Sequence, residues 1–142
     1  PNATVLEYVE GMAELMAASD LVICKPGGLT VTECLCAKAP MILLGRAYGQ
    51  ENINVRMLTS LGAALHVTTA RELVGAMGHV DANPAIVEAM LTQGSFLRRP
   101  NAAIDIARNA LRLAAAEPST DARMRKKHFL HFYWGHTPAH IR

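Results

Sequence analysis

Two adjacent glycines stand directly behind an apolar run in the stretch KPGGLTVTE, residues 25–33. Gly27 and Gly28 let the backbone approach a ligand closely and adopt positive φ where required, which a residue with a Cβ does poorly. A helix that begins behind them would direct unpaired N–H groups and about half a unit of positive charge into the turn. The arrangement suits an anion, and a diphosphate is its natural occupant. The signal alone is weak, because neither G-x-x-x-x-G-K-[ST] nor G-x-G-x-x-G is present.

The charged side chains around this turn have two interpretations each. Thr30 and Glu33 have the spacing of a capping box, in which the Glu33 carboxylate would accept a hydrogen bond from the Thr30 backbone N–H. Alternatively, Glu33 holds a ligand, and its side chain then points into the crevice beside Gly28 and Gln50. Lys25 either neutralises phosphate or is solvated.

A second glycine-containing loop, GRAYGQEN at residues 45–52, follows another apolar run. Ligands of parallel α/β sheets gather at the carboxyl ends of the strands, so we expect the two glycine loops to face one crevice. Gln50, Glu51 and Asn54 would there offer polar groups to sugar hydroxyls. The alternative role of these three residues is to cap the helix that follows.

Short apolar segments alternate with helical patterns along the chain, which predicts parallel strands joined by crossover helices. The expected strands are residues 5–9, 21–24, 41–44 and 63–67. The expected helices are residues 12–18, a helix that begins near residue 29 or 30 and ends at about residue 38, and residues 51–61, 69–77, 84–92 and 100–116. Gly62 is expected to end the third helix, and Thr69 with Glu72 has capping-box spacing at the start of the fourth. Asn83 and Pro84 are typical of a cap and a first helical residue, and Gln93-Gly94 is expected to end that helix.

Composition indicates one soluble globular unit. The chain has 142 residues, of which 51% are apolar and 18% charged, and its longest apolar runs are far short of the roughly 20 residues of a membrane helix. A net charge of +2 does not favour nucleic acid as a partner. Three cysteines without a second cluster predict reduced thiols in a cytosolic protein. No secretory signal opens the chain, and because residue 1 is Pro we expect the true start upstream.

Residues 117–142 lose periodicity, and we interpret them as a tail behind a domain of residues 1–116. The tail is basic and gathers four of the six histidines with four aromatic residues, at His128, Phe129, His131, Phe132, Tyr133, Trp134, His136 and His140. Imidazoles bind metals, but these spacings match no closed site. The segment suits a membrane interface, or it is a packed or frayed tail.

Several motifs in a fixed order carry a family resemblance: VEGM at 9–12, KPGG-x-T-x-x-E at 25–33, PMI at 40–42, GQE-x-x-N at 49–54 and GAA at 62–64. Together they resemble the C-terminal half of a GT-B glycosyltransferase. The similar enzymes are diacylglycerol glycosyltransferases, including monogalactosyldiacylglycerol synthases, and the N-acetylglucosaminyltransferase of peptidoglycan lipid synthesis. The likeness is strong over residues 5–67 and loose to about residue 116. It implies an α/β fold with a partial Rossmann-like parallel sheet and flanking helices, an incomplete GT-B C-terminal domain.

The resemblance also implies a chemistry. The donor would be a UDP-sugar, transferred with inversion to a lipid-linked hydroxyl, with no cofactor and no metal bound at the donor site. The expected contacts are uracil at Tyr8, Val9 and Met12, diphosphate at Gly27, Gly28, Leu29 and Thr30, ribose at Glu33, and the sugar at Gln50, Glu51 and Asn54. The expected location is cytoplasmic, peripheral to the inner face of the membrane where the lipid acceptor lies.

The chain departs from the family pattern in two ways. Lys38 stands where the family usually has glycine, and a positive-φ cap there would cost roughly 1 kcal/mol with a Cβ present. By the resemblance, we expect the N-terminal domain that binds the acceptor and supplies the general base, and the first two strand–helix units of the donor domain, to lie outside these 142 residues. No catalytic residue is therefore assigned, and the chain alone is expected to be inactive. The alternative is a non-catalytic nucleotide-binding or interaction fragment.

The missing units predict a particular sheet. In the doubly wound order 3-2-1-4-5-6 they would lie between residues 5–9 and 21–24, so residues 5–9 lose both neighbours. We expect the other three strands to form a parallel core, with residues 5–9 displaced, irregular or completed by another chain. Exposed strand edges also offer a route to self-association.

Overall fold

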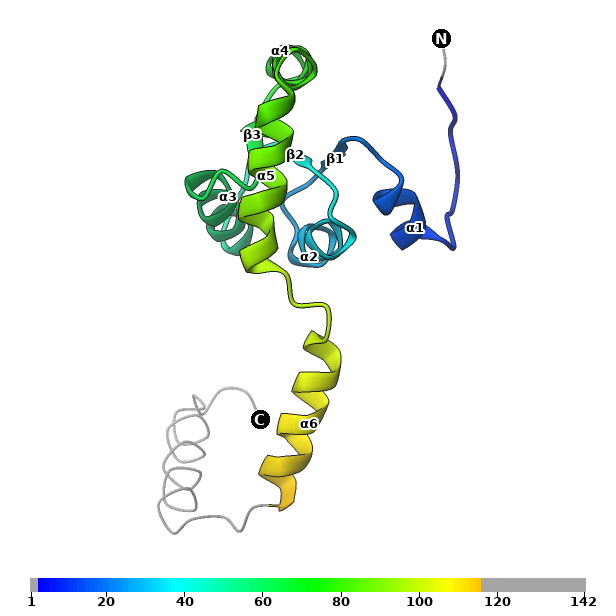
Figure 1. Cartoon of the computed structure of the whole chain (residues 1–142), viewed down its shortest axis with the longest axis vertical. Helices are drawn as coiled ribbons and strands as arrows, with labels where there is room; N and C mark the ends of the chain where they lie inside the picture. Colours follow the sequence, from blue (N-terminus) through cyan, green and yellow to red (C-terminus); the bar gives the residue numbers. More distant parts are fainter. Residues whose placement is uncertain (1–2, 116–142) are drawn as a thin grey trace, which may run out of the picture. The chain divides into compact units, whose positions relative to one another are not determined.

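The computed structural model describes residues 3–115 (Figure 1). Over this range, three strands alternate with the first four helices, and two further helices follow. Their order is α1 (Met12–Ala17), β1 (Val22–Cys24), α2 (Gly28–Ala37), β2 (Met41–Leu44), α3 (Gln50–Ser60), β3 (Leu65–Val67), α4 (Ala70–Ala82), α5 (Pro84–Leu97) and α6 (Ala102–Ala115). The tail of residues 117–142, with its histidines and aromatic residues, lies outside the described range.

The strands form one parallel sheet in the order β1-β2-β3. Val22 pairs with Met41 between β1 and β2, and Ile42 pairs with Leu65 between β2 and β3. The α/β class and the three-stranded parallel core predicted from the sequence are confirmed. Each outer strand is shorter than expected by one or two residues, at its amino end.

Residues 5–9 form no strand, so the strand expected there from composition alone is wrong. The segment is irregular and mostly exposed, with Val5 at 94% and Tyr8 at 81% exposure. A parallel strand needs partners for its backbone N–H and C=O groups. The described chain offers none at that place, which matches the expected displacement of this segment.

The central strand β2 is buried on both faces. Met41 and Leu43 pack into a cluster with residues of α2 and α3, and Ile42 packs into a second cluster with Val80 and Met90 of α4 and α5. Because successive side chains of a strand point to opposite faces, the helices cover the sheet from both sides. This double cover explains why β2 is a continuous apolar run.

The helix ends show how local sequence set the boundaries. Gly62 has φ of 72° just after α3, as predicted. Thr69 caps α4, where its Oγ1 accepts from the Glu72 N–H at 3.2 Å. Asn83 makes no side-chain cap for α5, since its Nδ2 donates to the His79 carbonyl oxygen of α4. The expected end of α5 at Gly94 is wrong, because Gly94 is buried against Leu35 and tertiary packing overrides its weak helix propensity.

Lys38 adopts the left-handed conformation, with φ of 59° and ψ of 38°, as the C-cap of α2. It is the one non-glycine residue with positive φ in residues 3–115. The chain therefore keeps a Cβ at a position that favours glycine.

Residues after Pro100 belong to a separate unit, of which α6 is the described part. None of its residues is buried, and Asp105 and Arg108 form an exposed ion pair at 3.0 Å. Exposed pairs of this kind contribute little stability. No helix among residues 3–115 is both long and apolar enough to cross a membrane.

Candidate functional site

The amino end of α2 is open toward solvent. Gly27 is the N-cap in an extended conformation, with φ of −69° and ψ of 141°, and no side chain caps the helix. The first N–H groups of a helix have no intrahelical partners and are free to bind a ligand. A Cβ built on Gly27 would meet no atom within 4 Å. Positive φ is not used at Gly27 or Gly28, so close ligand approach is the property that these glycines supply.

The first turn of α3 faces this helix end. Gly27 and Gly28 line a hollow of about 430 Å³ together with Gln50, Glu51 and Asn54. The hollow lies at the carboxyl ends of β1 and β2, because the two turns leave those strands directly. The expected meeting of the two glycine loops at one crevice is thus observed.

Asn54 ties the two loops together. Its Nδ2 donates to the Pro26 carbonyl oxygen at 2.9 Å, across 28 residues of sequence. A Cβ on Gly28 would lie 4.0 Å from the same Nδ2. Asn54 therefore positions the glycine turn, a role that the sequence did not reveal because the bond is made to a backbone atom.

A second unpredicted contact supports the loop after β2. His66 of β3 forms a hydrogen bond through Nε2 with the Gly45 carbonyl oxygen at 2.8 Å. The Gly45 N–H donates to the Val67 carbonyl oxygen at 2.9 Å. Gly49, with φ of 55°, then turns the chain into α3. The loop that presents Gln50 is thereby anchored to the neighbouring strand.

Glu33 does not lie beside Gly28 and Gln50, so that expectation is wrong. The Glu33 side chain lines a different hollow, of about 280 Å³, with Met12 and Met16 of α1. The reason is helical geometry, because residues five apart are rotated by about 140° around the axis. Glu33 also makes no capping box in the described structure, since Thr30 is the third residue of α2 and not its N-cap.

The residues expected to hold uracil are only partly brought together. Met12, at the start of α1, lines the hollow that contains Glu33. Val9 is half-buried and Tyr8 is exposed in the irregular segment, and neither lines a hollow described above. Leu29, in the first turn of α2, is 83% exposed.

Two thiols lie beneath the glycine turn. Cys24 ends β1, and Cys34 of α2 is fully buried next to it. The hydrogen bond with Cys24 and burial raise the pKa of Cys34. The same hydrogen bond lowers the pKa of Cys24, against the opposing effect of burial. Cys24 is also partly exposed, so the thiolate form is favoured at Cys24 over Cys34.

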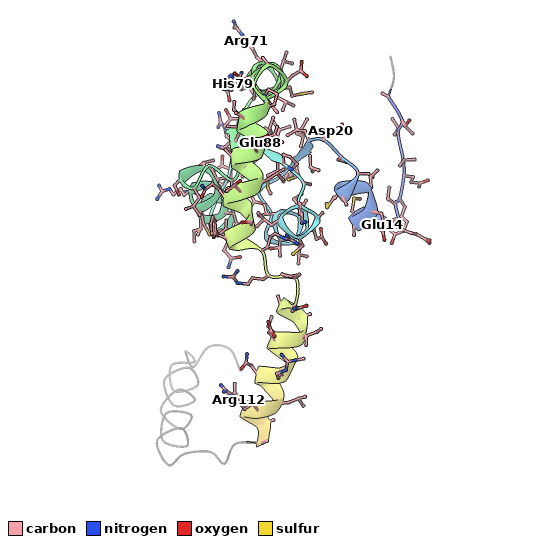
Figure 2. All side chains as sticks on the ribbon, in the orientation of Figure 1. Glu14, Asp20, Arg71, His79, Glu88 and Arg112 are labelled. Carbon is pink, nitrogen blue, oxygen red and sulfur yellow. The ribbon has the colours of Figure 1, made fainter. Side chains whose placement is uncertain are left out.

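A larger hollow, of about 660 Å³, lies at the other edge of the sheet from the glycine turn. Asp20, Asp81 and Glu88 line it, and Asp20 and Glu88 are labelled in Figure 2. Asp20 precedes β1, so this hollow lies at an amino end of the sheet, and its three carboxylates would repel a diphosphate. The hollow beside the glycine turn is therefore the better candidate for an anionic ligand. Within residues 3–115, no three His, Cys, Asp or Glu side chains lie close enough together to hold a metal ion.

Comparison with known proteins gives the class of this domain. The family model described as "Glycosyltransferase family 28 C-terminal domain" matches residues 1–90, and the chain belongs to that family. The chain is 41% identical over 73 residues to a processive diacylglycerol beta-glucosyltransferase of Staphylococcus carnosus, covering 51% of this chain and 19% of that protein.

Two further relatives extend the match. A UDP-N-acetylglucosamine--N-acetylmuramyl-(pentapeptide) pyrophosphoryl-undecaprenol N-acetylglucosamine transferase of Azotobacter vinelandii is 32% identical over 108 residues, which is 71% of this chain and 30% of that protein. The crystal structure of Acinetobacter baumannii MurG superposes with a TM-score of 0.62 and 25% identity, covering 72% of this chain and 31% of that one. The chain thus spans at most about a third of these relatives. The expected likeness to lipid glycosyltransferases is confirmed.

Proposed function

We propose that this chain is the part of a lipid glycosyltransferase that binds the UDP-sugar donor. The observation that carries the proposal is the uncapped start of α2, with Gly27 open to solvent and facing Gln50 and Glu51 across one hollow. Backbone N–H groups and the helix dipole there would hold the diphosphate without a metal. The names of the relatives given above describe enzymes that use nucleotide-sugars or act on lipids, which agrees with this assignment.

The nucleotide would run along the side of α2. Gly28 and Glu33 are separated by about 7.5 Å along the helix axis. Because Glu33 is also rotated by about 140° from Gly28, a ligand with its diphosphate at the amino end of α2 would curve around the helix to bring its two ribose hydroxyls to the Glu33 carboxylate. Met12, beside Glu33, then contacts the base, and Gln50 and Glu51 face the sugar.

Catalysis needs groups that the described residues do not place at this site. Abstraction of a proton from the acceptor hydroxyl requires a base within hydrogen-bond reach. In the proposed whole enzyme, that base and the acceptor site belong to an N-terminal domain. The transfer would invert the configuration at the anomeric carbon of the sugar. The enzyme would act from the cytoplasmic side, at the membrane surface where its lipid acceptor lies.

Calorimetric titration of the full chain with UDP tests the donor-binding role, with ADP as the matched control. We expect heat with UDP and with UDP-sugars and much weaker binding of ADP. Glu33→Ala should weaken UDP binding by roughly 1.5 to 3 kcal/mol, which is about tenfold to a hundredfold. Glu88→Ala, an exposed carboxylate of another hollow, should leave the affinity unchanged.

Two results would contradict the proposal. UDP that binds the parent and Glu33→Ala equally would remove Glu33 from the site, and no binding of UDP at all would favour a structural or interaction fragment. Transfer of sugar to diacylglycerol by the purified chain would show that it needs no second domain.

A further inference from the structure

A hollow of about 250 Å³ lies between α2 and α5, at the other end of the strands from the glycine turn. Ala39 and Ala63, which line it, stand just before β2 and β3, so the hollow opens at the amino ends of these strands. Apolar side chains make most of its wall, among them Leu35, Met41 and Met90. The nucleotide site proposed above does not use any of these residues.

Two cationic side chains line this apolar hollow. Lys38 comes from the end of α2 and Arg98 from the end of α5, and none of the described residues that line the hollow is acidic. Ser95 is a further polar residue in the wall of the hollow. A mostly apolar wall with a few convergent polar groups is the usual composition of a small-molecule site.

The Arg98 guanidinium has an unused donor. Its Nη2 donates to the Cys36 carbonyl oxygen at 3.3 Å, which holds the group against α2. Its Nε is buried and has no hydrogen-bond partner among the described residues. The guanidinium keeps further N–H donors, on Nη1 and Nη2, for which the described residues supply no acceptor.

The Lys38 backbone is an independent observation at the same place. Its φ of 59° puts a residue with a Cβ into a conformation that favours glycine. Such outliers cluster at functional sites, and they are a starting point for a functional hypothesis. Lys38 lines the same hollow as Arg98.

We propose that this hollow binds a short-chain carboxylate. One carboxylate oxygen accepts from the Arg98 guanidinium and the other from the Lys38 ammonium, in charge-assisted hydrogen bonds. The apolar chain of the ligand contacts Leu35, Met41 and Met90. A volume of about 250 Å³ equals the liquid volume of about eight waters, which matches a six-carbon acid and is too small for a nucleotide.

The probe is sodium hexanoate, and the readout is the NMR signal of the methyl groups of Met41 and Met90. Both methionines are at least 97% buried and line the hollow, so their methyl shifts report its contents. Hexanoate should shift both signals in a saturable manner. Hexanol, which has the same chain without the charge, and inorganic phosphate, which has the charge without the chain, should shift them far less.

Matched variants test the two cations. Lys38→Gly fits the left-handed backbone and should weaken hexanoate binding by at least about tenfold without loss of folding, and Arg98→Gln should do the same. Arg71→Gln, an exposed cation of α4 labelled in Figure 2, should have no effect. Unshifted methionines with hexanoate, equal shifts with hexanol or with phosphate, or unchanged affinity in Lys38→Gly would each overturn the proposal.

Discussion

Removal of the Asn54 amide should loosen the glycine turn. Asn54 Nδ2 is the side-chain donor that holds the Pro26 carbonyl, and Pro26 is one of the most deeply buried residues of the chain. In Asn54→Ala the Pro26 oxygen loses this donor while its surroundings stay closed. The turn that carries Gly27 and Gly28 would then keep the helical hydrogen bond from the Val31 N–H to the Gly27 carbonyl oxygen, at 3.0 Å, but would lose its tie to α3.

The expected cost follows from the geometry of this bond. A neutral hydrogen bond contributes about 0.5 to 1.5 kcal/mol net, and a buried acceptor left unpaired costs about 1 to 3 kcal/mol. We therefore expect Asn54→Ala to lower the free energy of unfolding by about 1 to 3 kcal/mol. The variant should also bind UDP more weakly, because the N–H groups of α2 would no longer be held at fixed positions.

Urea denaturation of the parent and the variants measures this effect. Asn54→Ala should lower the midpoint with an unchanged slope. Asn52→Ala, the same change at an exposed position of α3, should leave the midpoint within about 0.5 kcal/mol of the parent. Asn54→Asp should be at least as damaging at neutral pH, because a carboxylate cannot donate to the Pro26 oxygen. An Asn54→Ala variant with parental stability and parental UDP affinity would refute the positioning role.

Three other predictions concern the helix ends and the thiols. Hydrogen bonds from the Thr68 N–H at 2.7 Å and the Thr68 hydroxyl hold the pKa of Glu72 below its usual value, so their stabilisation is present at neutral pH and is lost as pH falls through the folded pKa. Glu72→Gln should lower the melting temperature at pH 7, with a deficit that shrinks below about pH 4.3. Lys38→Gly should raise the free energy of unfolding by about 0.5 to 1 kcal/mol in urea titrations, whereas Lys38→Ala should not. Iodoacetamide should alkylate Cys24 well before Cys34, as peptide mass spectrometry would detect, because the pKa of Cys24 is lowered and Cys34 is fully buried.

The fold was largely predictable because its signals are local. The apolar runs of the strands, the cap at Thr69 and the glycine at Gly62 each specify a boundary within a few residues. The failures have a tertiary cause. Residues 5–9 have the composition of a strand but no neighbour to pair with, and α5 continues through Gly94 because that residue packs against Leu35.

The candidate site was predictable in its parts and less so in its arrangement. The two glycine turns meet as expected, since the carboxyl ends of parallel strands share one edge. The place of Glu33 was missed because its rotation around α2 depends on where the helix begins. The supports from Asn54 and His66 were missed because both bond to backbone oxygens, which leave no pattern of side-chain types in a sequence.

The most direct test of the donor site is an amide NMR titration of the isotopically labelled full chain with UDP. The account predicts that the largest shifts occur at the amides of Gly28, Leu29 and Thr30, with further shifts near Met12 and Glu33. Saturable UDP binding whose shifts leave the first turn of α2 unmoved would contradict it.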